Sequence, residues 1–84
     1  MRALIELAAA RRDHEAVGSY SLRLLERDPF DEPAHLALVA ARSAARAHGE
    51  ARRAYGGYIA RMEQIGVEPA PFPAAHLTNR SQSP

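Results

Sequence analysis

The chain has 84 residues and no cysteine, so it allows one domain with a modest core and excludes both a disulfide framework and a thiolate metal site. Its 11 basic and 10 acidic residues leave a formal net charge of +1. That balance excludes a global electrostatic field that would attract nucleic acid or anionic lipid.

The segment from Arg2 to about Arg12 predicts a first helix, because Leu4 and Leu7 recur at helical spacing among strong helix formers. Glu6 interrupts the apolar run, and two arginines follow where a signal-peptide cleavage site requires small residues. No apolar run reaches the roughly 20 residues of a membrane span. We therefore expect a cytoplasmic chain with no membrane contact.

A second helix is predicted from His14 to Arg27, with Asp13 as the residue whose side chain caps its first amides. The expected apolar stripe of this helix consists of Val17, Tyr20, Leu24 and Leu25. Pro29 disfavours helical backbone at the residue before it and lacks the N–H that would extend the helix. The Asp-Pro step at residues 28–29 therefore predicts a turn.

A third helix is predicted from Glu32 to about Ala47, with Asp31 as its N-cap and a proline in its first turn. Its composition is so rich in alanine that it can approach neighbouring helices on two sides. We expect the pair His48-Gly49 to close this helix, because glycine tolerates left-handed backbone.

A fourth helix is predicted from Glu50 to about Gln64, followed by Gly66 as the left-handed residue that ends it. Gly56 and Gly57 lie in its middle and each cost about 1 kcal/mol relative to alanine. Their presence predicts the close approach of a neighbouring backbone or a bend in the helix.

Residues 67–84 differ in character from the helical part. Prolines at positions 69, 71 and 73 favour an extended path, which Val67 and Phe72 could anchor to the helices. The polar residues 78–84 are expected to be disordered. The predicted organisation is a helical domain over residues 1–66 and an extended to disordered, proline-rich tail over residues 67–84.

Together these elements predict an all-α fold of two antiparallel helical hairpins similar to a tetratricopeptide repeat. The segment Arg12–Val17 in the first hairpin corresponds to Gly49–Ala54 in the second, an offset of about 37 residues, close to the tetratricopeptide period of roughly 34. A stack of two repeats leaves both of its ends uncapped. We therefore expect the chain to form a homo-oligomer or to require a neighbouring domain.

Three segments carry a resemblance to a known family: Leu24–His35 (LLERDPFDEPAH), His48–Tyr58 (HGEARRAYGGY) and Ile65–Pro71 (IGVEPAP). In this order and spacing they resemble the bacterial transcriptional activator domain, the tetratricopeptide-like helical module of the Streptomyces antibiotic regulatory protein family and related regulators. The resemblance covers only the C-terminal part of that module. Family members usually have further helices before the first segment, and the stretch 60–64 is shorter and less acidic here.

The resemblance implies a protein–protein interaction module of a cytoplasmic transcription activator, which makes dimer, interdomain or partner contacts. In such regulators the module normally follows a winged-helix DNA-binding domain. Nothing in this chain resembles that domain, so the resemblance implies that any contact with DNA is indirect.

The sequence offers little for catalysis or for a cofactor. The four histidines are His14, His35, His48 and His76, and no two of them have the spacing of a zinc enzyme motif. Asp31 lies four residues before His35 but is more useful as an N-cap. The carboxylates of Glu6, Glu15 and Glu63 have no partners placed by sequence. We expect neither an enzyme, nor a metal site, nor a cofactor.

The candidate partner-binding residues flank the turn between the third and fourth helices: Arg42, Arg46, Arg52, Arg53 and Tyr55. Arginines clustered in this way can bind phosphates or an acidic protein surface. Direct nucleic-acid binding through this cluster is the alternative function, and it predicts a steep dependence on salt. The simpler interpretation is that Glu50 and solvent neutralise the arginines at an exposed edge and that the tyrosines pack between helices.

Overall fold

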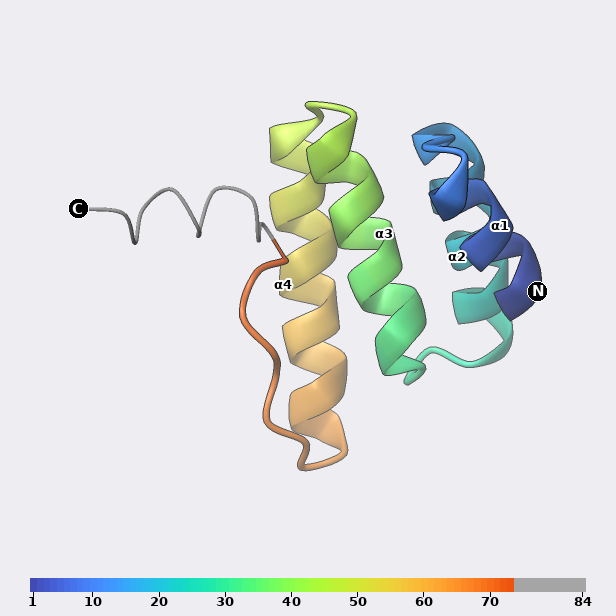
Figure 1. Ribbon diagram of the computed structural model, residues 1–84. Helices are drawn as coiled ribbons and strands as arrows, with labels where there is room; N and C mark the ends of the chain where they lie inside the picture. Colours follow the sequence, from blue (N-terminus) through green and yellow to red (C-terminus); the bar gives the residue numbers. More distant parts are fainter. Residues whose placement is uncertain (74–84) are drawn as a thin grey trace.

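The computed structural model describes residues 1–73, and within that range all regular structure is helical. The helices are α1 (Arg2–Ala10), α2 (His14–Arg27), α3 (Glu32–Ala44) and α4 (His48–Gln64). Consecutive helices run antiparallel, and residues 67–73 return along α4 without regular secondary structure (Figure 1). The prediction of an all-α fold is confirmed, while the prediction of disorder for residues 78–84 lies outside the described range.

Side-chain caps begin α2 and α3 at the predicted residues. The Asp13 carboxylate accepts a hydrogen bond from the Ala16 amide at 3.1 Å, and the Asp31 carboxylate accepts one from the Ala34 amide at 3.0 Å. Each bond satisfies an amide that has no partner within its own helix. Between the two helices the chain turns at Pro29, as the sequence predicts.

Asp31 also joins the start of α1 to the start of α3. Its second oxygen accepts a hydrogen bond from the Arg2 guanidinium at 2.5 Å. Partial burial of Asp31 acts to raise its pKa, but the bonds from Arg2 and from the Ala34 amide prevail, so the pKa lies below its ordinary value. The charged form of Asp31 is therefore favoured in the folded chain.

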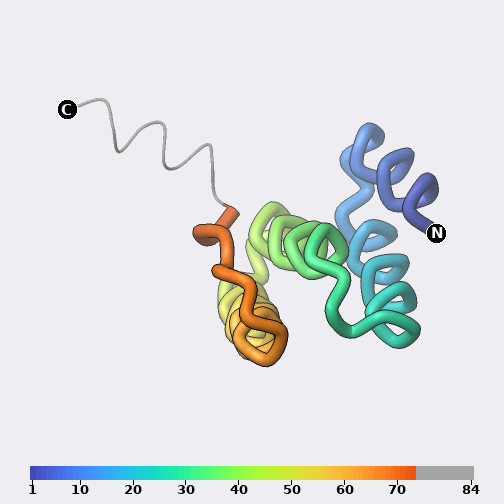
Figure 2. The backbone as a smooth tube through the Cα atoms, turned by 90° about the horizontal axis from the view of Figure 1, so that it is seen from below, coloured from blue at the N-terminus to red at the C-terminus, as the bar shows by residue number. Residues whose placement is uncertain are grey.

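The helices form an open row in which α1 packs on α2, α2 on α3, and α3 on α4 (Figure 2). One core lies among the first three helices and contains Ile5, Ala8, Val17 and Ala41. Most of the other buried residues belong to α3 and α4 and include Leu38, Val39, Ala51, Tyr58 and Met62. The alanine-rich α3 is thus covered on two sides, as predicted.

Three helices end with the same backbone motif. After α1, α3 and α4 a residue with positive φ follows the C-cap: Arg12 (58°), Arg46 (65°) and Gly66 (70°). In the second case the Arg46 amide donates to the Ser43 carbonyl and the Ala47 amide donates to the Arg42 carbonyl, at 3.0 and 2.9 Å. This is the Schellman pattern, in which a left-handed residue lets the last carbonyls of a helix find donors.

These motifs correct several predicted helix bounds. The first helix ends at Ala10 and the third at Ala44, because Arg12 and Arg46 adopt the left-handed conformation that the sequence analysis reserved for glycine. The pair His48-Gly49 does not close the third helix: both residues lie in the first turn of α4, which begins before Glu50. The matching turns at Arg12 and Arg46 are 34 residues apart, so the predicted offset of about 37 is also too long.

The close approach of a neighbouring backbone that was predicted at Gly56 and Gly57 is not found. A Cβ placed on either glycine has no atom within 4 Å, apart from its immediate chain neighbours and the helix's own backbone. Both residues are exposed, and α4 continues unbroken through them. No neighbouring backbone within the described residues requires a glycine at these positions.

Candidate functional site

The structure divides the predicted arginine cluster. Arg42 is half-buried and connects three helices: its Nε lies 3.7 Å from Oε1 of Glu50 in α4, and its guanidinium lies against Gly18 of α2. A Cβ added to Gly18 would stand 3.1 Å from one guanidinium nitrogen of Arg42. Arg42 is therefore engaged within the fold and is not a free cation at the surface.

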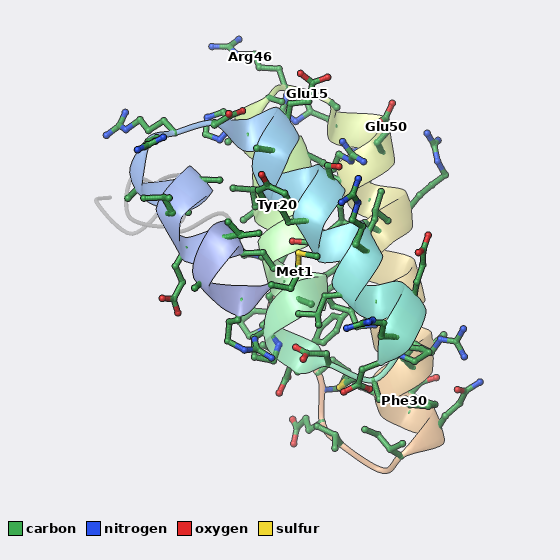
Figure 3. The ribbon with its side chains drawn as sticks, turned by 90° about the vertical axis from the view of Figure 1, so that its right-hand side faces the viewer. Met1, Glu15, Tyr20, Phe30, Arg46 and Glu50 are labelled. Carbon is green, nitrogen blue, oxygen red and sulfur yellow. The ribbon has the colours of Figure 1, made fainter. Side chains whose placement is uncertain are left out.

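The other predicted arginines are exposed at the end of the molecule that carries the α3–α4 turn. Arg46 projects from this turn, and Glu15 and Glu50 lie at the same end (Figure 3). Arg52 and Arg53 follow in the second turn of α4. Acidic side chains therefore lie at the same end of the molecule as these arginines.

The antiparallel path brings further arginines to this end. Arg11 and Arg12 follow α1 and are both exposed. The α1–α2 turn that holds them lies at the same end of the molecule as the α3–α4 turn (Figure 1). Arg11 and Arg12 were not among the predicted site residues, although the predicted hairpin topology contained the signal: the first and third turns of an up-and-down helical row lie at the same end.

Tyr55 takes part in an internal contact rather than standing free. Its hydroxyl donates a hydrogen bond to the Ala70 carbonyl at 2.6 Å, and its ring meets that of Phe72 edge to face with centroids 5.2 Å apart. Phe72 thus anchors residues 67–73 as predicted, whereas Val67 remains 38% exposed. We call residues 67–73 the strap.

Tyr58 holds the strap from the next turn of α4. Its side chain is fully buried, its hydroxyl accepts a hydrogen bond from the Ala70 amide at 2.7 Å, and the same hydroxyl donates to Oε2 of Glu32 at 2.6 Å. Both polar groups of the Ala70 backbone are therefore bound by tyrosines. These tyrosines were predicted to pack between helices, and their hydrogen bonds to the strap were not predicted.

The environment of Tyr58 raises the pKa of its hydroxyl. Burial disfavours the charged phenolate, and the hydrogen bond donated to Glu32 stabilises the neutral form further, against a smaller opposing effect of the Ala70 amide. The ring of His35 lies 5.7 Å from that of Tyr58. This histidine shares a 2.6 Å hydrogen bond with the Pro29 carbonyl, so it belongs to the packed turn.

Residues of α1, α2 and α3 line an apolar groove. Its volume is about 240 Å³. Its lining residues are Ile5 and Ala9 from α1, His14 and Val17 from α2, and Ala37, Ala40, Ala41 and Ala44 from α3. We call it the α1–α3 groove. With one histidine among apolar side chains, it offers packing surface and no set of groups for acid–base chemistry.

A second apolar surface lies on α1 itself. Leu4 is 44% exposed and Leu7 is 49% exposed. Both also line a smaller groove of about 90 Å³ between α1 and α2, beside Ala8 and Tyr20. Two large apolar side chains one turn apart on an end helix form a surface that water solvates poorly.

The described residues contain no metal-binding constellation. No group of three or more histidines or carboxylates within residues 1–73 is placed to hold a metal ion, and His76 lies outside that range. In the same range no helix is long and apolar enough to cross a membrane.

Comparison of the chain with protein-family models, with curated protein sequences and with solved structures found no match.

Proposed function

We propose that the chain is a protein–protein interaction module of a bacterial transcription activator, which makes dimer, interdomain or partner contacts in the cytoplasm. The observation that carries this proposal is the uncovered apolar face of α1, where Leu4 and Leu7 are each nearly half exposed. A further helix or another chain that packs on the end of a helical row would cover such exposed apolar side chains.

Two observations support the module assignment. The helices pack in sequence order as an open row, which is the arrangement in which helical repeats present docking surfaces. The matching turns at Arg12 and Arg46 recur after 34 residues, which agrees with the tetratricopeptide period. The resemblance of Leu24–His35, His48–Tyr58 and Ile65–Pro71 to the activator family supplies the proposed biological setting.

The test uses association of the whole chain in solution. We expect the wild-type chain to self-associate at micromolar concentration in sedimentation experiments, and the double variant Leu4→Glu with Leu7→Glu to remain monomeric with the same helicity. Leu22→Glu is the matched control, because Leu22 is 43% exposed on α2 and does not line either groove of α1. A wild-type chain that is a compact and highly stable monomer would contradict the proposal.

Direct nucleic-acid binding is the second candidate, and one observation favours it. Arg11 and Arg12 share an end of the molecule with Arg46, which gives a basic surface larger than the sequence alone predicts. Binding through that surface requires affinity for duplex DNA that falls steeply as salt rises. If gel-shift experiments at low salt detect no complex, this candidate is removed.

A further inference from the structure

The strap is bound in a way that resembles recognition of an extended peptide. Within Pro69-Ala70-Pro71 the only backbone N–H belongs to Ala70, because proline has none. That N–H donates to the Tyr58 hydroxyl at 2.7 Å, and the Ala70 carbonyl accepts from the Tyr55 hydroxyl at 2.6 Å. The two tyrosines therefore bind both backbone groups of Ala70, the one residue of this tripeptide that has an N–H.

The side chains of Ala70 and Phe72 define the ligand further. The Phe72 ring packs edge to face on Tyr55, while Ala70 contributes only a methyl group where its backbone meets both hydroxyls. Proline-rich segments lose little conformational entropy on binding because their extended form is already populated, and aromatic grooves commonly bind them. The required pattern is a small residue between two prolines, followed by an aromatic residue.

We propose that the Tyr55–Tyr58 face of α4 is a binding site for an extended segment of a partner protein with the pattern proline, small residue, proline, aromatic residue, and that the strap occupies this site within the chain. The site lies on the far side of the row from the α1–α3 groove. It is thus separate from the α1 surface on which the proposed function rests.

A partner protein fits this site better than a second copy of the chain. Only residues 67–69 separate Gly66, at the end of α4, from Ala70, so the strap can reach the α4 of another copy only if two α4 ends meet. A short linker also gives the strap an effective local concentration in the millimolar range. Each copy's strap is thereby held on its own tyrosines, whereas a partner segment has no such competing site.

The test releases the strap in the whole chain and then supplies its sequence as a separate peptide. Ala70→Pro removes the N–H that donates to Tyr58 and places a ring carbon against its hydroxyl. The probe is the fluorescently labelled peptide VEPAPFP, which reproduces residues 67–73. Fluorescence anisotropy should show binding to the Ala70→Pro chain that is at least tenfold tighter than binding to the wild-type chain, whose strap competes.

Matched controls separate this site from general adhesion. Tyr55→Phe in the Ala70→Pro chain should weaken peptide binding about fivefold, as expected for loss of one neutral hydrogen bond. The peptide VEPPPFP, which lacks the central N–H, should bind at least tenfold more weakly than VEPAPFP. Phe72→Ala provides a second way to loosen the strap if Ala70→Pro lowers the helicity measured by circular dichroism.

Three results would overturn the proposal. The first is a strap-released chain with native helicity that does not bind VEPAPFP. The second is equal binding of VEPAPFP and VEPPPFP, which would show that the N–H of the central residue does not contribute to binding. The third is a wild-type dimer that Tyr58→Phe abolishes, because the occupant in trans would then be a second copy of the chain.

Discussion

Replacement of Tyr58 by phenylalanine removes one hydroxyl from two hydrogen bonds and leaves the ring in place. The bond to Glu32 involves a charged acceptor, a class of bond that contributes about 1.5–3 kcal/mol, and the bond from the Ala70 amide is a neutral one of about 1 kcal/mol. Glu32 is only partly buried, so water can replace part of its loss. We expect Tyr58→Phe to lower the free energy of unfolding by about 2–3 kcal/mol.

The assay is thermal and urea unfolding followed by circular dichroism, with Tyr55→Phe as the matched control. Tyr55 makes one neutral hydrogen bond, to the Ala70 carbonyl, so its loss should cost about 1 kcal/mol. For a domain of this size, the difference between the variants corresponds to a melting temperature lower by roughly 10 °C in Tyr58→Phe.

The pH dependence provides an independent check on the same hydroxyl. Because its pKa in the folded chain lies above the ordinary value of 10.0, its contribution is complete below that value and is lost as pH rises through the folded pKa. The stability difference between wild type and Tyr58→Phe should therefore shrink in strongly alkaline solution. Equal stabilities of Tyr55→Phe and Tyr58→Phe at pH 7, or a difference that grows above pH 10, would refute the hydrogen-bond assignment.

Three further predictions concern two glycines and two residues at helix ends. Gly57→Ala should stabilise the chain by about 1 kcal/mol in urea unfolding, because a Cβ there meets open space. Gly18→Ala should raise the free energy of unfolding by less, because the Arg42 side chain must move to make room for the Cβ. Equal stabilisation by the two substitutions would contradict this packing. Arg46→Gly should stabilise by about 0.5–1 kcal/mol by removing a side chain from left-handed backbone, and Arg46→Ala, which retains a Cβ, should not. Asp31→Asn keeps a capping oxygen but loses the charge that pairs with Arg2, so it should cost about 1 kcal/mol at pH 7. Because the pKa of Asp31 is lowered in the folded chain, the stability difference between wild type and Asp31→Asn should disappear as pH falls below the ordinary value of 3.8 and through the folded pKa. Unfolding of both proteins over an acid pH series measures this loss.

Local chemistry made the helices and the starts of α2 and α3 predictable. Asp13 and Asp31 are strong N-caps followed by apolar residues at helical spacing, so α2 and α3 begin where the sequence indicates. The ends of α1 and α3 were predicted less well because arginine occupies the left-handed position, and no local signal distinguishes such an arginine from a helical one.

The candidate sites depend on contacts that sequence spacing does not reveal. Arg42 meets Gly18 and Glu50 only because α3 packs between α2 and α4. Likewise, Tyr55 and Tyr58 find Ala70 because the chain reverses at Gly66 and returns along α4. Such contacts join residues of different elements, so they follow from tertiary packing rather than from periodicity.

The open row of helices has a consequence for how the chain folds. Most of its packing joins elements that are neighbours in sequence, so little loop entropy is lost before the first contacts form, and collapse should be fast for a chain of this length. Packing between sequence neighbours also makes unfolding less cooperative at the ends of the row. Helix α1 can detach while the pairing of α3 with α4 persists. A partner that binds α1 would therefore also stabilise the helix that packs least against the rest of the chain.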